Sequence, residues 1–141
     1  MKPGVGVGIM VIENNKILLG LRNPNKLKAD SELKGEGTWT MPGGKVDFME
    51  KLVDAAKREL EEETSLIAKK LELLCISDDM TETAHYVTVG FILKEYIGEV
   101  KTMEPETIIE WKWFDMNDLP KNIYIPSKKC IDKYKEGIIY E

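Results

Sequence analysis

Apolar residues along the chain fall into short runs with the composition of β-strands. Strands are predicted for VGVGIMVIE, KILLGLR, LELLCIS, HYVTVGFILKEY and IIEWKWF, because these runs are rich in β-branched and aromatic residues. TWTMPGG reads as a short strand that ends at Pro42 and two glycines. The Asn14-Asn15 pair predicts a tight turn, so the chain is expected to open with a hairpin.

One central segment has helical spacing instead. From about Glu50 to Thr64, the apolar residues Leu52, Val53, Ala56 and Leu60 recur on one face and form a stripe that we expect to pack on a sheet. A second helix is predicted for PSKKCIDKYKEG, which has proline at its start and glycine at its end. Strands outnumber helices without a regular βαβ alternation, so the predicted fold class is α+β.

The stretch from Asn23 to Gly37 is polar, carries glycine and predicts a long loop. Two interpretations stay open, a loop that faces a substrate and a mobile insertion on the surface.

Length and composition favour one domain over residues 1–141, since 43% of the residues are hydrophobic and 32% are charged. The net charge of −5 argues against a partner that is a nucleic-acid polymer.

Cys75 and Cys130 show neither metal-site spacing nor the density of a disulfide scaffold, so we interpret them as ordinary thiols of a cytoplasmic protein. The first 15 residues lack a cleavage site and the length to span a bilayer, so no membrane association is expected. A homodimer stays open.

The most unusual stretch is RELEEETS, with Arg58 beside four glutamates. At 100° per residue, Glu59, Glu62 and Glu63 fall within about 100° of arc, and Glu61 points the opposite way. A solvated helix face is the ordinary interpretation of such a run. The three carboxylates border the apolar stripe, however, and partly shielded carboxylates favour a hard cation, Mg²⁺ or Mn²⁺, over zinc.

Two neighbouring features bear on this cluster. Arg58 reaches Glu62 across one turn, and its planar guanidinium suits orienting one carboxylate. Gly43-Gly44 would let the backbone turn tightly before the helix, which frees a carbonyl to face the same cation or amides to face a phosphate.

The segment from Gly44 to Leu66 resembles the Nudix box, G-x5-E-x7-R-E-U-x-E-E-x-G-U, in which U is an aliphatic residue. Only the last fixed glycine differs, because Ser65 stands there. If the helix ends at Ser65 in the left-handed conformation, serine costs about 1 kcal/mol relative to glycine. The resemblance implies an α/β/α sandwich with a mixed sheet and hydrolysis of a nucleoside diphosphate linked to another group.

The resemblance also implies roles in the site. Arg58 would orient Glu59, and Glu50 would support the site. Mg²⁺ is the implied cofactor, with Mn²⁺ as the alternative. The implied metal ligands or catalytic bases are Glu59, Glu62 and Glu63, with the Gly44 carbonyl as a further candidate ligand.

The flanking segments GTWTMPGGKVDF, HYVTVGF and EPETIIEWKWFDMNDLP resemble the MutT-type nucleoside triphosphate pyrophosphatases. That resemblance implies hydrolysis of a nucleoside triphosphate to the monophosphate and pyrophosphate. Glu104 is then the candidate for a further metal-binding or catalytic glutamate on a late loop, with Glu106 next. ADP-ribose hydrolases of the family carry a proline after the box, whereas here none occurs between Pro42 and Pro105.

Alternative functions remain. One is a hydrolase of ADP-ribose, nucleotide sugars or dinucleoside polyphosphates, and another is a non-catalytic nucleotide-sensing module. Four residues are candidates for binding the nucleotide substrate: Arg22, Trp39, His85 and Asn122. For His85 a purely structural role stays open, and for Trp39 a place in the core.

Overall fold

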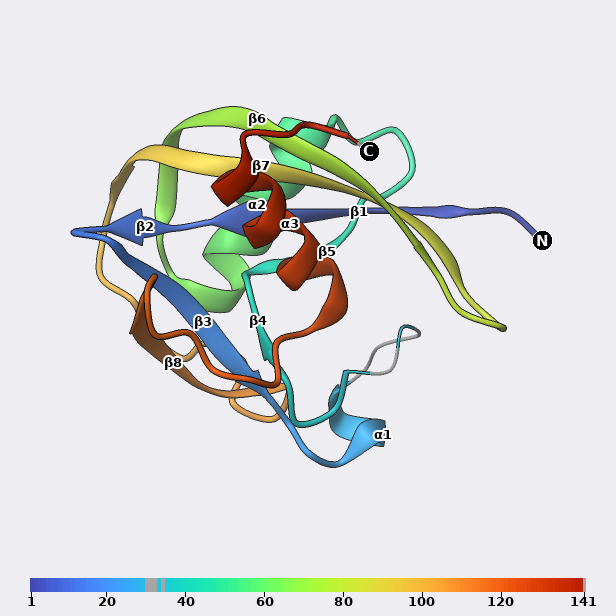
Figure 1. The fold of residues 1–141 in the computed structure, drawn as a ribbon, viewed down its shortest axis with the longest axis horizontal. Coiled ribbons are helices and arrows are strands. Elements are labelled where there is room, and N and C mark those ends of the chain that lie inside the picture. The colour runs from blue at the N-terminus through green and yellow to red at the C-terminus, as the bar shows by residue number, and fades with distance from the viewer. Residues whose placement is uncertain (30–32, 34, 141) are drawn as a thin grey trace.

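The computed structural model describes residues 1–29, 33 and 35–140, and the elements below belong to this part of the chain (Figure 1). The strands are β1 (Gly4–Met10), β2 (Ile12–Glu13), β3 (Lys16–Arg22), β4 (Trp39–Thr40), β5 (Gly43–Lys45), β6 (Ile67–Met80), β7 (His85–Ile97) and β8 (Ile108–Asp115). The helices are α1 (Lys26–Ala29), α2 (Leu52–Thr64) and α3 (Ile125–Glu136).

The larger sheet has the strand order β5-β1-β7-β6. β1 runs parallel to β7 and antiparallel to β5, and β6 and β7 form a long antiparallel hairpin. In the second sheet β3 pairs with β2, β4 and β8, in each case antiparallel. The larger sheet is therefore mixed, as the family resemblance implied.

The two long helices cover opposite faces of the larger sheet, with α3 in front and α2 behind in Figure 1. Neighbouring residues of β1 point to opposite faces, because side chains alternate along a strand. Ile9 belongs to a core cluster with Leu60 of α2, and Met10 to a second cluster with Ile131 of α3. The fold is α+β with a helix–sheet–helix arrangement, which confirms the predicted class.

The predicted opening hairpin is only partly correct. Asn14 and Asn15 make the turn with positive φ angles of 52° and 60°, and β2 pairs with the start of β3. β1, in contrast, belongs to the other sheet. Ile9, Met10 and Val11 are all buried, and consecutive buried residues are typical of a central strand covered on both faces.

The central helix begins at Leu52, two residues later than predicted, because Glu50 belongs to a turn in which its N–H donates to the Asp47 carbonyl. Leu52 is 39% exposed, so its predicted place in the packed stripe is wrong. The buried side chains of α2 are Ala55, Ala56, Leu60 and Thr64.

Both helix ends follow local chemistry. α2 ends at Ser65 in the left-handed conformation, with φ of 72° and its N–H donating to the Glu61 carbonyl at 2.9 Å. α3 has Pro126 in its first turn and Gly137 after its last, as predicted.

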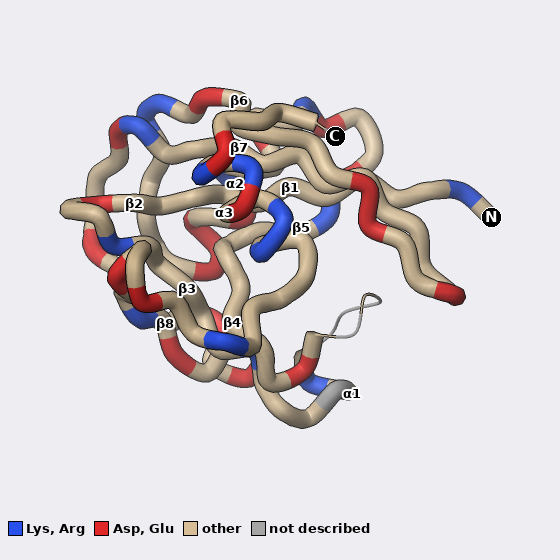
Figure 2. Tube along the Cα trace, in the orientation of Figure 1, with Lys and Arg blue, Asp and Glu red and all other residues tan. Residues whose placement is uncertain are grey.

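No helix in the described part of the chain is long and apolar enough to cross a membrane. Figure 2 shows basic and acidic positions interspersed around the fold.

Candidate functional site

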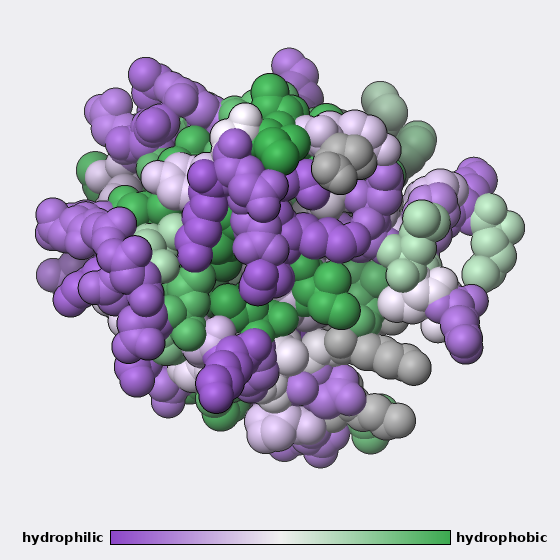
Figure 3. Space-filling model, viewed as in Figure 1, coloured by the Kyte–Doolittle hydropathy of each residue, from purple (hydrophilic) through white to green (hydrophobic). Residues whose placement is uncertain are grey.

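A cleft of about 690 Å³ lies beside β1, between the acidic face of α2 and the start of α3. Its walls come from segments that are far apart in the sequence. They include Arg22, Leu27, Ala29 and Leu33 from β3 and the segment after it, Glu59, Glu62 and Glu63 from α2, Glu104, Tyr86 and Thr88 from β7, and Tyr124 and Ser127 at the start of α3. Figure 3 shows apolar side chains exposed next to the hydrophilic ones of α3.

The floor of this cleft is largely bare backbone. Gly6 and Gly8 alternate with valines on β1, so both glycines face the cleft while Val7 packs in the core. A Cβ added at Gly6 would meet only the Gly44 carbonyl, at 3.3 Å. A Cβ at Gly8 would lie 3.1 Å from the Met41 side chain, so the open part of the floor is at Gly6.

Gly43 and Gly44 lie in extended β5, opposite Gly8 and Val7 of β1, so the predicted tight turn at this pair is wrong. Close packing is the reason for glycine here. A Cβ at Gly43 would lie 2.2 Å from the Val7 carbonyl, and one at Gly44 would lie 1.9 Å from Oε2 of Glu59. The glycines let the Glu59 carboxylate lie directly against the strand.

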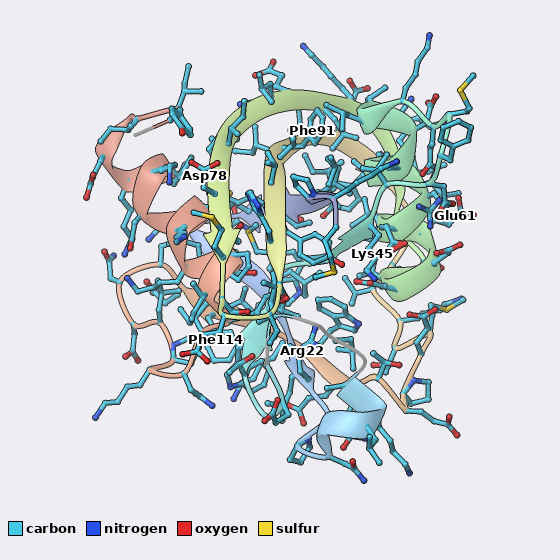
Figure 4. All side chains as sticks on the ribbon, turned by 90° about the vertical axis from the view of Figure 1, so that its right-hand side faces the viewer. Arg22, Lys45, Glu61, Asp78, Phe91 and Phe114 are labelled. Carbon is cyan, nitrogen blue, oxygen red and sulfur yellow. The ribbon has the colours of Figure 1, made fainter. Side chains whose placement is uncertain are left out.

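The acidic face has the predicted phase. Glu59, Glu62 and Glu63 all line the cleft. Glu61 is exposed and points outward from α2 in Figure 4. The helical geometry thus brings three of the four carboxylates to one wall, as the 100° rotation per residue predicted.

Glu104 reaches the same cleft from the loop between β7 and β8. That loop crosses the C-terminal end of α2, where the N–H of Lys101 donates to the Thr64 carbonyl at 2.9 Å and that of Met103 to the Glu63 carbonyl at 3.4 Å. Carbonyls at a helix end lack partners within the helix, so they can anchor a loop. Glu104 is thereby held beside the acidic face.

Arg58 donates hydrogen bonds to three carboxylates at once. Its Nε and Nη2 donate to the two oxygens of Glu50 at 2.8 and 3.0 Å, and its Nη1 donates to Glu59 at 2.6 Å and to Glu62 at 3.2 Å. Nη2 also donates to the Lys45 carbonyl at 3.0 Å. The hydrogen bonds from Arg58 lower the pKa of Glu50 to about 2. The paired carboxylates in turn raise the pKa of Arg58.

Three of the carboxylates that line the cleft have raised pKa values, in contrast to Glu50. Burial, followed by the charge of Glu59, raises the pKa of Glu63 well above its usual range, although the Gly43 N–H donates to its Oε1 at 3.2 Å. Burial also raises the pKa of Glu59, and burial together with Glu62 raises that of Glu104. Negative charge in this wall is therefore costly without a cation.

The donor set fits a hard divalent cation, because it consists of carboxylate and carbonyl oxygens. In the described ranges, no three acidic, histidine or cysteine side chains already converge on one point. Two of the carboxylates are held by hydrogen bonds, Glu59 by Arg58 and Glu63 by the Gly43 amide. The carboxylates that would hold such a cation already line one cleft.

Arg22 lines the cleft, but its guanidinium is engaged. Nε donates to the Gly35 carbonyl at 3.0 Å, Nη2 donates to the Ala29 carbonyl at 2.6 Å, and the group lies 4.7 Å from the centre of the Tyr124 ring. Arg22 thus ties the segment after β3 to the cleft wall. The predicted loop from Asn23 to Gly37 contains α1, and residues 30–32 and 34 of it lie outside the described residues.

The other three candidates for substrate binding do not line the cleft. Trp39 packs edge-on against Phe114, with 4.8 Å between ring centres, beside the second core cluster. His85 is exposed at the start of β7, and the Asn122 side chain donates to the Gly37 carbonyl at 2.8 Å. Their substrate-binding roles stay predictions. Glu106, the alternative to Glu104, is exposed and also outside the cleft wall.

Several cleft residues escaped the sequence reading. Thr40 and Ser127 are buried, with their hydroxyl oxygens 3.2 Å apart, and the Ser127 Oγ accepts the Met41 N–H at 2.9 Å. This contact joins β4 to α3 across a large sequence distance, so no local pattern indicates it. The alternating glycines of β1 were a usable signal for the bare floor.

The chain matches the family model described as NUDIX domain over residues 2–134. A protein of Methanocaldococcus jannaschii named ADP-ribose pyrophosphatase is 36% identical over 141 aligned residues, which cover 97% of this chain and 78% of that protein. A Danio rerio protein named oxidized purine nucleoside triphosphate hydrolase is 29% identical over 126 residues, covering 79% of this chain and 66% of that protein. The crystal structure of a MutT NUDIX hydrolase from Burkholderia pseudomallei superposes with a TM-score of 0.85 at 28% identity, covering 94% of this chain and 98% of that one.

Proposed function

We propose a specific reaction for this chain, which belongs to the NUDIX domain family and is a Nudix hydrolase. The substrate is a nucleoside triphosphate, ordinary or with a modified base. The chain cleaves it between the α- and β-phosphates, and the products are a nucleoside monophosphate and pyrophosphate.

The observation that carries this proposal is the position of Glu104. The resemblance to MutT-type enzymes implied a late-loop glutamate near the box carboxylates, and Glu104 lines the cleft together with Glu62 and Glu63. The similarity to the MutT structure and to the Danio rerio triphosphate hydrolase supports the same choice.

The reaction has to bring water to a phosphorus atom inside a chain of negative charges. Nudix hydrolases generally use divalent metal ions, and we propose Mg²⁺, which when bound neutralises phosphate charge and acidifies water. Among the residues of this chain, Glu59, Glu62, Glu63 and Glu104 supply the oxygens that would hold it.

The protein groups have separate tasks. Arg58, fixed at two atoms by Glu50, holds Glu59 in place, so that this carboxylate keeps its orientation as charge develops nearby. A cleft-side glutamate that is not occupied as a ligand accepts the proton of the attacking water, because burial raises its proton affinity. The bare floor at Gly6 accommodates the nucleotide.

A second candidate substrate is ADP-ribose. The M. jannaschii relative, named ADP-ribose pyrophosphatase, covers almost the whole chain at 36% identity. ADP-ribose contains the same kind of phosphoanhydride bond, so the acidic wall could serve both reactions. The absence of a proline between Pro42 and Pro105 argues for the triphosphate. The cytoplasmic location and a homodimer stay predictions.

Product analysis in ¹⁸O-labelled water with Mg²⁺ separates these candidates. We expect nucleoside triphosphates to give monophosphate and pyrophosphate, with the label in one product marking the attacked phosphorus. If triphosphates stay intact and ADP-ribose gives AMP and ribose phosphate, the second candidate replaces the first. If no nucleotide is cleaved with any divalent ion, a nucleotide-sensing module is the better account.

A further inference from the structure

The two cysteines of the chain meet in the fold, which their spacing in the sequence did not indicate. Cys75 lies on β6 and Cys130 on α3, 55 positions apart, and their sulfur atoms are 3.1 Å from each other. Each residue is only 2% exposed. The pair therefore joins the sheet and a helix at a buried contact.

The neighbouring strand leaves space for this pair. Gly90 of β7 lies directly beside Cys75 in the sheet register. A Cβ added at Gly90 would lie 2.7 Å from the sulfur of Cys75 and 2.7 Å from that of Cys130. Any larger residue at position 90 would push the two sulfurs apart or displace α3.

The two thiols are also chemically unequal. The hydrogen bond between the two sulfur atoms lowers the pKa of Cys75, and the positive charge of Lys133 contributes to the same effect. The same hydrogen bond and burial raise the pKa of Cys130. Cys75 is thus the better nucleophile, and Cys130 is the thiol that would react with Cys75 after Cys75 has been oxidised.

We propose that Cys75 and Cys130 form an oxidative modification site, at which a hydroperoxide converts the pair into an intramolecular disulfide. The Cys75 thiolate attacks one peroxide oxygen, so the O–O bond breaks and Cys75 becomes a sulfenic acid while hydroxide leaves. The sulfur of Cys130 then attacks the sulfur of Cys75, forming the S–S bond and expelling water. Overall, two thiols and one hydrogen peroxide give one disulfide and two waters. Local opening of the contact between α3 and β6 admits this small oxidant.

The disulfide would fasten α3 to the sheet. Ser127, which lines the cleft, lies one turn before Cys130 on α3, so the cross-link lies next to one wall of the cleft. A bond that closes a loop of this length restricts the unfolded chain, and the oxidised protein should resist unfolding better. This inference does not depend on which nucleotide the chain cleaves.

The test treats the whole purified chain with hydrogen peroxide, then denatures it in an alkylating agent and analyses it by mass spectrometry. We expect the loss of two hydrogen masses, no alkylated cysteine, one cross-linked peptide containing Cys75 and Cys130, and full reversal by dithiothreitol. The oxidised chain should also unfold at a higher urea concentration than the reduced one.

The matched controls are Cys75→Ala and Cys130→Ala. Neither variant should lose two hydrogen masses or gain urea resistance on oxidation, and Cys130→Ala should accumulate an oxidised Cys75 that a sulfenic-acid probe captures. If wild-type oxidation gives only sulfinic acids or disulfides between chains, or if oxidation leaves the urea midpoint of the wild type unchanged, the proposal is wrong. The wild-type measurements decide this even if a variant fails to fold.

Discussion

Arg58 is the residue on which the geometry of the acidic face most depends, because one guanidinium holds Glu50, Glu59 and Glu62. Its planar fork binds both oxygens of Glu50 and still reaches Glu59. A lysine has the charge but presents a single ammonium, so it cannot hold the carboxylates in these positions.

Arg58→Lys should therefore lower kcat roughly ten- to a hundredfold and change KM much less, because a supporting residue of a metal site acts through the orientation of its ligands. Steady-state kinetics at saturating Mg²⁺ measures both parameters. A rise in KM with normal kcat would instead place Arg58 in contact with the substrate.

The backbone conformation of Ser65 lowers the stability of the fold, as the sequence already indicated. It stands in the left-handed conformation, with φ of 72°, where a side chain is unfavourable. Ser65→Gly should raise the free energy of unfolding by about 1 kcal/mol, measured by urea denaturation. Ser65→Ala keeps a Cβ and should give no comparable gain. Equal stabilisation by both substitutions would refute the backbone explanation.

At the scale of elements, the contact between β5 and α2 sets the position of Glu59. A Cβ at Gly44 would lie 1.9 Å from the Glu59 carboxylate, whereas one at Gly6 would meet only the Gly44 carbonyl. Gly44→Ala should thus lower kcat at least about tenfold by displacing a proposed ligand. Gly6→Ala should mainly raise KM, because it narrows the floor. Kinetics of both variants, with circular dichroism to verify folding, tests this, and the opposite assignment of effects would contradict it.

The elements also show what the sequence could predict. The phase of Glu59, Glu62 and Glu63 on α2 followed from helical rotation alone, since that property is local. The pairing of β1 with β7 did not, because it depends on a contact between distant segments. Gly43-Gly44 was misread for the same reason, since its glycines are required by contacts with Val7 and Glu59 and not by a turn.

For the molecule as a whole, the cleft is formed by segments that are far apart in the sequence. Glu104 could be predicted from its place in the family pattern, whereas Trp39, His85 and Asn122, which were also predicted to bind the nucleotide, do not line the cleft. Cys75 and Cys130 likewise come together only through the packing of α3 on the sheet. Residue type indicates which chemistry a side chain can perform, but the packing of distant segments determines which groups it contacts.

Mg²⁺ should stabilise the whole fold if the acidic wall holds it, because a ligand that binds only the native state shifts unfolding by about 2.7 kcal/mol at a hundredfold excess over Kd. Differential scanning calorimetry should therefore show a higher Tm with MgCl₂ than with NaCl of equal ionic strength, and a chelator should reverse the shift. In Glu63→Gln the shift should shrink. The same shift in the variant would exclude Glu63 as a ligand.

The most direct test of the central claim, that the cleft face of α2 performs the hydrolysis, compares the kcat of Glu63→Gln with that of Glu61→Gln. The two variants make the same chemical change on the same helix, but only Glu63 lines the cleft and Glu61 is exposed on the far side. Glu63→Gln should lower kcat by a factor of about a hundred or more, the scale expected for removal of a metal ligand or base. Glu61→Gln should leave kcat within about twofold, as surface changes usually do. Near-normal turnover of Glu63→Gln, or an equal loss in both variants, would contradict the account.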